Sequence, residues 1–182
     1  MWRRFFAILG SAIFLFLAPG TLAGLVPWWI SHWRMQEALF GLQALRWVGA
    51  GLILAGVVAI IECFARFAWQ GLGTPAPVFP TKRLVVMGLY RHVRNPMYCA
   101  VTGMILGQGL LLGDAWLIGY GAAVWLAVHL FVLTYEEPTL CRTYGADYEA
   151  FRAGVPRWMP RLRPWRGSTT SPQVILDSTN QP

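Results

Sequence analysis

Long hydrophobic runs separated by polar segments dominate the chain. Four runs are long enough, or nearly long enough, to cross a membrane: residues 5–30, 45–69, 97–112 and 115–135. A span needs about 20 mostly apolar residues to cross a hydrocarbon layer of about 30 Å. Because the runs are continuous and do not alternate with polar residues, each is predicted to be a helix, whose backbone hydrogen bonds are satisfied within lipid.

The first run has two interpretations. Arg3 and Arg4 ahead of it, and the small residues Thr21-Leu22-Ala23 near its end, resemble a signal peptide with a cleavage site. Apolar residues resume at positions 25–30, however, after an interruption at Pro19-Gly20. This continuation favours a kinked, retained span that ends in an aromatic belt.

The remaining segments are polar or rich in proline. Three prolines within residues 71–80 forbid a regular helix and predict an extended connection. After the fourth run, Pro138 favours a new helix that lies along the membrane interface. One face of this helix carries Leu140, Tyr144, Tyr148 and Phe151.

These patterns predict an all-α integral membrane protein with about four transmembrane helices and a C-terminal interfacial helical segment. We divide the chain into three parts. They are an N-terminal hairpin of two spans (residues 1–74), a region of two spans with flanking polar segments (75–166), and a polar, disordered tail (167–182).

Composition and charge support this prediction. Of the 182 residues, 56% are hydrophobic and 13% charged, and the mean hydropathy of +0.47 is too high for one soluble core. Of the 15 Lys and Arg residues, 13 lie on one side of the predicted membrane. The positive-inside rule therefore puts both termini and the polar segments in the cytoplasm, at a plasma membrane of bacterial type. The net charge of +7 indicates topology and contact with anionic lipid rather than nucleic-acid binding.

The cysteines predict neither a disulfide framework nor a metal site. Cys63, Cys99 and Cys141 are scattered, with no Cys-x-x-Cys pair and no His at ligand spacing. We therefore interpret all three as packing residues.

One ionisable pair lies within the second run. Glu62 precedes Arg66 by four residues, which places both on one helical face. The spacing predicts an internal ion pair near the membrane edge, and the alternative is that Glu62 lines a substrate path.

Two polar segments carry the candidate chemistry. The first, residues 88–98, leads into the third span, where Asn95 is predicted to be the N-cap residue and Pro96 to begin the helix. The backbone N–H groups of this helix start, together with Arg94, would suit an anion. Alternatively, the segment is a basic collar at the membrane edge.

The second polar segment, residues 136–157, follows the fourth span. Glu136 and Glu137 at its start either cap the next helix or pair with nearby arginines. Together, the two segments bring cations, carboxylates and aromatic rings to one membrane face. These groups suit a pocket for a charged cofactor beside a lipid-borne substrate.

The order and spacing of these residues resemble a known family. The first segment reads Gly88-x-Tyr90-x-x-x-Arg94-Asn95-Pro96-x-Tyr98. The second reads Glu136-Glu137-x-x-Leu140-x-x-x-Tyr144-Gly145-x-x-Tyr148-x-x-Phe151-x-x-x-Val155-Pro156-Arg157. In this order, they are similar to the signature of the isoprenylcysteine carboxyl methyltransferases and the related phospholipid methyltransferases. The resemblance covers residues 75–165, and the first two spans match only in being hydrophobic.

The resemblance implies an integral membrane methyltransferase that uses S-adenosylmethionine without a Rossmann domain. Glu136 matches a residue near substrate and cofactor, and is the expected catalytic group together with Arg94. Glu136 and Glu137 are expected to bind the substrate. The positions that match cofactor-contacting residues are Lys82, Arg83, Leu84, Val85, Tyr90, Asn95, Pro96, Met97 and Tyr98.

Two departures from the family pattern bear on the ligands. Eukaryotic prenylcysteine enzymes carry Arg-His-Pro where this chain has Arg-Asn-Pro, and Asn95 can still hydrogen-bond a cofactor. They also carry an Arg one turn before the first Glu, where this chain has Val132, which cannot pair with a substrate carboxylate. His129, one turn nearer the middle of the span, either contributes instead or is paired within the bundle.

We therefore expect methyl transfer to a lipophilic acceptor, either an isoprenylcysteine-type carboxylate or another hydrophobic carboxylate or thiol. The alternative acceptor is the amine of a phospholipid or another amine, from which Glu136 or Glu137 would take a proton. Two other classes fit parts of the pattern: a sterol-reductase-like enzyme that uses NADPH, and a non-catalytic membrane adaptor. The expected partners are the lipid bilayer and a lipophilic or prenylated substrate, and the pattern leaves the oligomeric state open.

Overall fold

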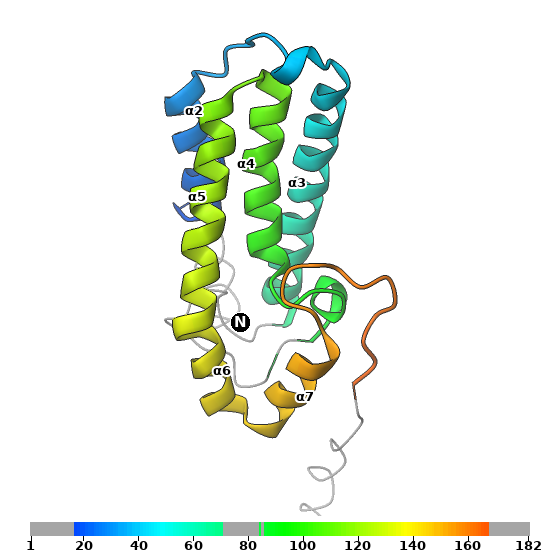
Figure 1. Ribbon diagram of the computed structural model, residues 1–182. Coiled ribbons are helices and arrows are strands. Elements are labelled where there is room, and N and C mark those ends of the chain that lie inside the picture. The colour runs from blue at the N-terminus through cyan, green and yellow to red at the C-terminus, as the bar shows by residue number, and fades with distance from the viewer. Residues whose placement is uncertain (1–16, 71–83, 85, 168–182) are drawn as a thin grey trace, which may run out of the picture.

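The computed structural model describes residues 17–70, 84 and 86–167, and these are helical with no strand among them (Figure 1). The short elements η1 and η4 are π-helical turns, and η2 and η3 are 3-10 turns. The prediction of an all-α fold is confirmed over these ranges. In chain order the elements are η1 (Thr21–Leu25), α2 (Val26–Ser31), η2 (Leu39–Gly41), α3 (Ala44–Gln70), η3 (Gly88–Arg91), α4 (Pro96–Leu112), α5 (Ala115–Phe131), η4 (Val132–Glu136), α6 (Glu137–Tyr144) and α7 (Ala146–Gly154).

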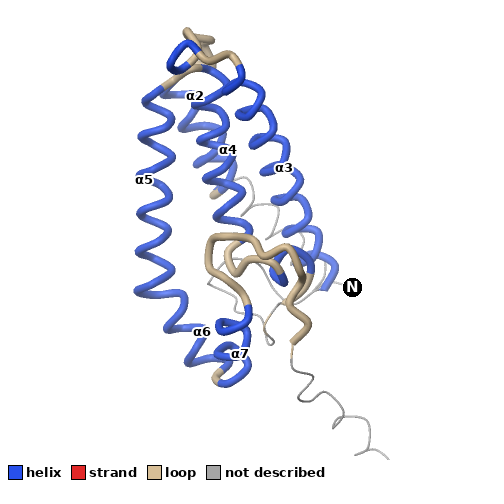
Figure 2. The backbone as a smooth tube through the Cα atoms, turned by 45° about the vertical axis from the view of Figure 1, so that its right-hand side comes forward, coloured by secondary structure: helices blue, strands red, loops and turns tan. Residues whose placement is uncertain are grey.

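Three long helices form the body of the bundle (Figures 1 and 2). α4 packs against both α3 and α5, while η1 contacts α4 and α2 contacts α5. Glycines let α3 and α4 approach closely, since a Cβ at Gly107 would lie 2.7 Å from the Gly49 carbonyl oxygen. Small residues at such contacts are typical of helix packing in membranes. The buried core between the helices consists of Ala23, Ile60, Phe64, Ala100, Val101, Ile105 and Val124.

Two helical stretches are long and apolar enough to cross a membrane. They are Ala44–Arg66 in α3, and Ala115–Tyr144, which runs from α5 through η4 into α6. Both expose large apolar side chains, such as Trp47 at 81% and Leu130 at 52%, as expected for a lipid-facing surface. α4 is apolar but has only 17 residues, and the first run is described only from residue 17. The membrane character is therefore confirmed, whereas the count of four spans stays a prediction.

Pro27 explains how the N-terminal helix is attached to the bundle. It has no N–H group, so carbonyl oxygens one turn earlier lose their usual donor. Side chains of two other helices replace it. Ala23 O accepts a hydrogen bond from Gln108 Nε2 of α4 (2.7 Å), and Leu22 O accepts one from the Tyr120 hydroxyl of α5 (3.1 Å). The chain near residue 22 is thereby fixed beside α4 and α5.

The helix of α5 continues past the point where a new helix was predicted to begin. Pro138 lies in the first turn of α6, and the chain enters α6 through η4 without a break. In η4 the N–H group of Glu137 donates to Val132 O, a π-type bond that accommodates one extra residue. The prediction of a single interfacial helix was also wrong, because Gly145 (φ +53°) separates α6 from α7. A positive φ of this kind favours glycine.

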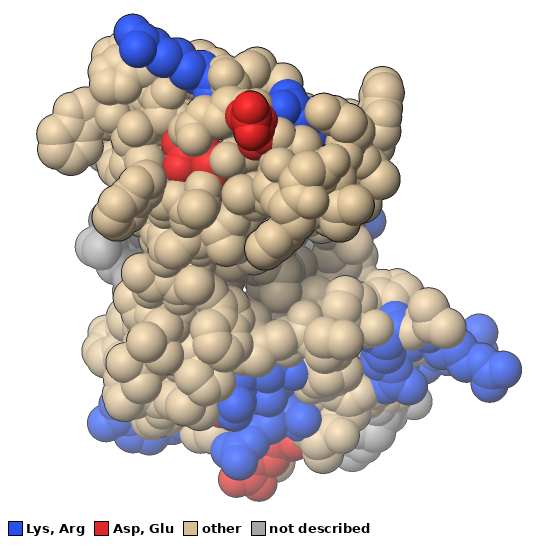
Figure 3. Space-filling view, turned by 45° about the horizontal axis from the view of Figure 1, so that its top comes forward, with Lys and Arg blue, Asp and Glu red and all other residues tan. Residues whose placement is uncertain are grey.

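Charged side chains lie mainly toward the two ends of the molecule, with an uncharged flank between them (Figure 3). Arg34 and Arg46 belong to the end where α2 connects to α3. Most of the other described arginines lie at the opposite end, with the two polar segments. The charge asymmetry of the sequence is therefore an asymmetry of the folded bundle.

Candidate active site

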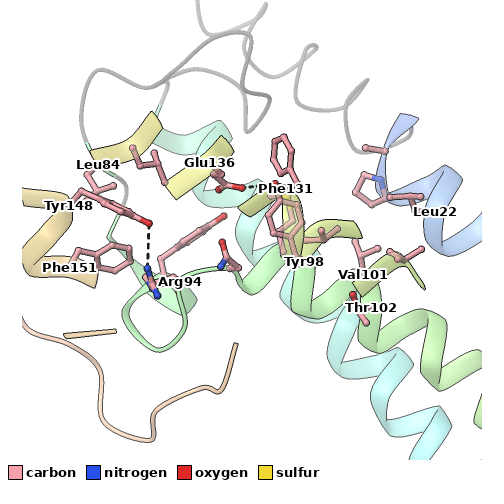
Figure 4. Close-up of a pocket in the computed structure, with 18 of the residues that line it drawn as sticks. Leu22, Leu84, Arg94, Tyr98, Val101, Thr102, Phe131, Glu136, Tyr148 and Phe151 are labelled. Carbon is pink, nitrogen blue, oxygen red and sulfur yellow. Dashed lines mark hydrogen bonds between the residues drawn. The ribbon is translucent and has the colours of Figure 1, made fainter. Parts of the chain in front are cut away.

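A cavity of about 420 Å³ lies at the end of the bundle that carries the two polar segments (Figure 4). In Figure 4, Arg94 and Tyr148 lie toward one side of it and Leu22 and Val101 toward the other. Polar and apolar side chains therefore both contribute to its walls. It is lined by Ala18, Pro19, Leu22, Leu84, Tyr90, Arg94, Asn95, Met97, Tyr98, Val101, Thr102, Val124, Val128, Phe131, Glu136, Leu140, Tyr144, Tyr148 and Phe151.

The first polar segment forms one wall. It begins with Gly88 at φ +56° and the short turn η3, which contributes Tyr90 to the lining. Asn95 is the N-cap residue of α4 and Pro96 is its first residue, as predicted. The Asn95 side chain makes no capping hydrogen bond, and its Nδ2 instead donates to Arg157 O (3.3 Å). Asn95 thus links the start of α4 to the C-terminal part of the chain.

Tyr98 and Glu136 meet inside the cavity. Tyr98 lies in the first turn of α4, and Glu136 is the last residue of η4. The Tyr98 hydroxyl donates a hydrogen bond to Glu136 Oε2 (2.9 Å; Figure 4). Glu136 is the one carboxylate among the described residues that line the cavity. The pair therefore forms an oriented proton acceptor beside apolar walls.

Glu137 has different partners, because successive residues of a helix point about 100° apart. Its Oε1 accepts a hydrogen bond from Arg94 Nη1 (2.9 Å). Arg157 binds both of its oxygens, with Nε at 2.6 Å and Nη2 at 2.9 Å. The side chains of Glu137 and Arg94 are each only 9% exposed. Pairing with nearby arginines, one of the two interpretations of the sequence, is confirmed for Glu137.

Arg94 connects this ion-pair cluster to the cavity. It lines the cavity, and its Nη1 also lies 3.5 Å from the Tyr148 hydroxyl. Burial raises the pKa of that hydroxyl, so it keeps its proton at neutral pH. The Arg94 Nε is buried and has no acceptor within the described part of the chain. A buried donor without an acceptor is costly, which makes this atom a candidate ligand contact.

The C-terminal segment, residues 155–167, returns along the first polar segment (Figure 1). The Arg94 N–H group donates to Pro156 O (2.9 Å), and the Arg161 N–H group donates to His92 O (3.0 Å). These backbone bonds, together with the ion pairs of Glu137, hold the segment beside the cavity. The Val-Pro-Arg motif therefore has a structural reason, because it brings Arg157 to Glu137.

Most of the predicted site residues come together at the cavity. Pro96 and Glu137 are next to lining residues in the chain but are not part of the lining. Lys82, Arg83 and Val85 lie outside the described residues, as do the residues before position 17 and the polar tail from residue 168. The predicted residues that line the cavity are Leu84, Tyr90, Arg94, Asn95, Met97, Tyr98 and Glu136.

Among the lining residues that were not assigned to the site from the sequence, two groups are informative. The first is the aromatic face formed by Tyr144, Tyr148 and Phe151, whose spacing predicted packing on the bundle or the lipid. That spacing was the signal that could have found them. The second group is Ala18, Pro19 and Leu22. It belongs to the first hydrophobic run, where uniform hydrophobicity gives no signal for a site.

Two other ionisable residues lie outside the cavity lining. His129 Nδ1 accepts a hydrogen bond from Trp158 Nε1 (3.0 Å), so His129 is paired within the protein, as one interpretation predicted. Glu62 pairs with Arg66, also as predicted. His129 and Glu62 are both absent from the lining of this cavity.

A helical membrane bundle with a carboxylate, an arginine and aromatic rings around a cavity at one end has the features of a membrane-embedded enzyme. The sequence model of the phospholipid methyltransferases matches residues 44–147, more than half of the chain. The chain therefore belongs to the phospholipid methyltransferase family, and the resemblance seen in the two polar segments is confirmed.

One curated relative is the phosphatidylethanolamine N-methyltransferase of Zygosaccharomyces rouxii, which is 25% identical over 123 residues. The match covers 64% of this chain and 14% of that protein, so the chain spans only a small part of the relative's length. No solved structure matches the chain. The family match begins at residue 44, inside the predicted N-terminal hairpin, and the division at residue 74 stays a prediction.

Proposed function

We propose that this protein is an S-adenosylmethionine-dependent methyltransferase that methylates the amine of a phospholipid headgroup. The observation that carries the proposal is the hydrogen bond from Tyr98 to Glu136 inside a cavity with polar and apolar walls. Family membership and the similarity to a phosphatidylethanolamine N-methyltransferase favour an amine acceptor. We therefore prefer the alternative acceptor of the sequence analysis to an isoprenylcysteine-type carboxylate or thiol.

The cavity has groups that suit S-adenosylmethionine. The buried Nε of Arg94 suits a carboxylate, and the rings of Tyr90 and Tyr148 suit a purine or a cation. A volume of about 420 Å³ is in the range of small-molecule sites. When bound, S-adenosylmethionine supplies a methyl group on a positively charged sulfur. As the family resemblance implies, we assign further cofactor contacts to Lys82, Arg83, Leu84, Val85, Asn95, Pro96, Met97 and Tyr98.

Glu136 acts on the proton of the acceptor. An alkylamine is protonated at neutral pH and becomes a nucleophile only when that proton is removed. The Glu136 carboxylate attracts the ammonium group and accepts its proton. The hydrogen bond from Tyr98 keeps the carboxylate oriented within the cavity, so less reorganisation is needed when the amine arrives.

The apolar walls serve the lipid part of the substrate. Leu22 of η1, together with Val124 and Phe131 of α5, contributes apolar walls next to the side of the molecule that faces lipid. They exclude water, which strengthens the electrostatic attraction between the carboxylate and the ammonium group. Val132 is fully buried and apolar, so a substrate carboxylate finds no partner at this position. This difference also favours an amine.

The acceptor is tested with purified protein reconstituted in liposomes and supplied with radiolabelled S-adenosylmethionine. We expect label in phosphatidylethanolamine liposomes, in a product that survives mild base, since an N-methyl bond resists hydrolysis. Parallel reactions contain a farnesylated cysteine in phosphatidylcholine liposomes. Label that appears only there, and is released by base as a methyl ester would be, contradicts the proposal.

The class of enzyme is tested separately by ligand binding. Calorimetric titrations with S-adenosylmethionine and S-adenosylhomocysteine should show saturable binding, and a titration with NADPH should not. Binding of NADPH alone would indicate a reductase. Binding of none of the three would indicate a non-catalytic adaptor.

A further inference from the structure

A second cleft, of about 510 Å³, lies beside η3. It is bounded by the end of α3, by η3 and by the C-terminal segment. Gly88, Leu89 and Arg91 of η3 line this cleft, whereas Tyr90 lines the active-site cavity. The two cavities have no lining residue in common, so η3 is a wall shared by two separate sites.

Basic side chains in the second cleft are held in fixed positions. Arg91 Nε donates a hydrogen bond to Trp165 O (2.7 Å), and His92 Nδ1 is bonded to Arg161 O (2.8 Å). Because a carbonyl oxygen only accepts, Nδ1 carries the proton of that bond. Carbonyl partners orient these side chains without neutralising the arginine. Part of the ordering cost of binding an anion is therefore already met by the fold.

The cleft has a positive net charge even though it also contains the ion pair of Glu62 and Arg66. Arg66 Nε donates to Glu62 Oε1, one helical turn earlier on α3. Arg66 remains 37% exposed, whereas Glu62 Oε2 is buried. The charges of Arg66 and Arg91 thus outnumber that of Glu62 among the described residues lining the cleft.

Gly88 joins this ion pair to η3. Its φ is +56°, and a Cβ at this position would overlap Arg66 Nε and Glu62 Oε1. The turn therefore rests directly on the ion pair. A ligand that binds Arg66 and Arg91 connects α3 with η3, the turn that also carries Tyr90.

We propose that this cleft binds the phosphate group of an anionic phospholipid that is not the methyl acceptor. Two arginines from different elements can donate to separate oxygens of one phosphate, for which the guanidinium geometry is well suited. The cleft lies at the end of a membrane-spanning helix, at the level of the lipid headgroups. Exposed Met87 and Pro164 give it an apolar rim for the glycerol part of a lipid. Free phosphate carries the same group and is the competing source.

Native mass spectrometry of the full chain in detergent tests the proposal by titration with phosphatidylglycerol, phosphatidylcholine and inorganic phosphate. We expect phosphatidylglycerol to bind about tenfold more tightly than phosphatidylcholine. The double variant Glu62→Gln/Arg66→Gln keeps the net charge, and should weaken this binding about tenfold. The control Arg163→Gln removes an exposed arginine outside the cleft and should bind like wild type.

Displacement of the lipid by millimolar phosphate would show that the phosphate group alone is recognised, and no displacement would assign the site to lipid, so both outcomes support the proposal. Binding of phosphate but not of lipid overturns it, as does equal binding of the two lipids. If the double variant does not fold, Arg91→Lys is measured, and unchanged lipid affinity in that variant overturns the proposal. The readout needs no methyl transfer, so it is independent of the proposed enzymatic function.

Discussion

At the scale of single residues, two adjacent glutamates have opposite surroundings. Glu136 meets the Tyr98 hydroxyl in the cavity, and Glu137 meets two arginines. Neutralising a carboxylate in a cavity removes a proton acceptor, whereas neutralising one in a buried ion pair leaves cations without a partner. The same substitution at neighbouring positions should therefore affect activity in one case and stability in the other.

Glu136→Gln should reduce the rate of methyl transfer by about 10²- to 10⁴-fold, because the amide cannot accept the proton of the amine. Its unfolding midpoint should match that of wild type, since the amide can still accept the hydrogen bond from Tyr98. The rate is measured with radiolabelled methyl donor in phosphatidylethanolamine liposomes. Glu149→Gln, at an exposed carboxylate of α7, is the matched control. Near-normal turnover in Glu136→Gln would remove this residue from the mechanism.

Glu137→Gln should lower the free energy of unfolding by about 3 to 5 kcal/mol, the usual cost of breaking a buried ion pair. The side chain of Arg94 is only 9% exposed, and the substitution leaves its charge without the carboxylate that compensates it. Equilibrium unfolding in detergent micelles measures the loss, again with Glu149→Gln as the control. Stability equal to that of wild type would mean that the pair is solvated in the folded protein.

At the scale of elements, the sequence predicts what is local. Asn95 and Pro96 mark the start of α4 correctly, because the fixed φ of a proline suits the first turn of a helix and depends on neighbouring residues only. The capping hydrogen bond expected from the Asn95 side chain is not formed. The break at Gly145 and the continuous passage through Pro138 were missed. A proline is tolerated inside that helix because the π-helical turn η4 changes the hydrogen-bond register, and this compensation does not show in the pattern of apolar residues.

The N-terminal helix offers a test of such compensation. Gln108→Leu removes the donor to Ala23 O and should cost about 1 to 3 kcal/mol, because a buried carbonyl then has no partner. Pro27→Ala restores a backbone N–H group, so the same Gln108 substitution should cost less in that background. Hydrogen exchange at residues 22–26 and unfolding in detergent measure the stability of the wild type, the two single variants and the double variant. If Gln108→Leu lowers the free energy of unfolding equally in the two backgrounds, Gln108 does not replace the donor that Pro27 lacks.

At the scale of the whole molecule, the cavity combines residues that are far apart in the chain. Leu22, Tyr98 and Glu136 come from three helical segments, and their meeting depends on how the bundle packs. The two polar segments could be linked from the sequence because their order and spacing matched a family. The contribution of the first run could not, because a uniformly apolar helix does not reveal which face it presents to its neighbours.

We propose that the cavity end of the bundle faces the cytoplasm, since most arginines lie there and positive charge is retained on that side of a plasma membrane. Asp147→Cys on α7 and Arg34→Cys at the other end report the two sides, because both positions are exposed. They are introduced after Cys99 and Cys141 are replaced by alanine. A membrane-impermeant maleimide added to intact cells should label position 34 and not 147, and inverted vesicles should give the reverse. Labelling of position 147 in intact cells would invert the topology and place methyl transfer on the outer face.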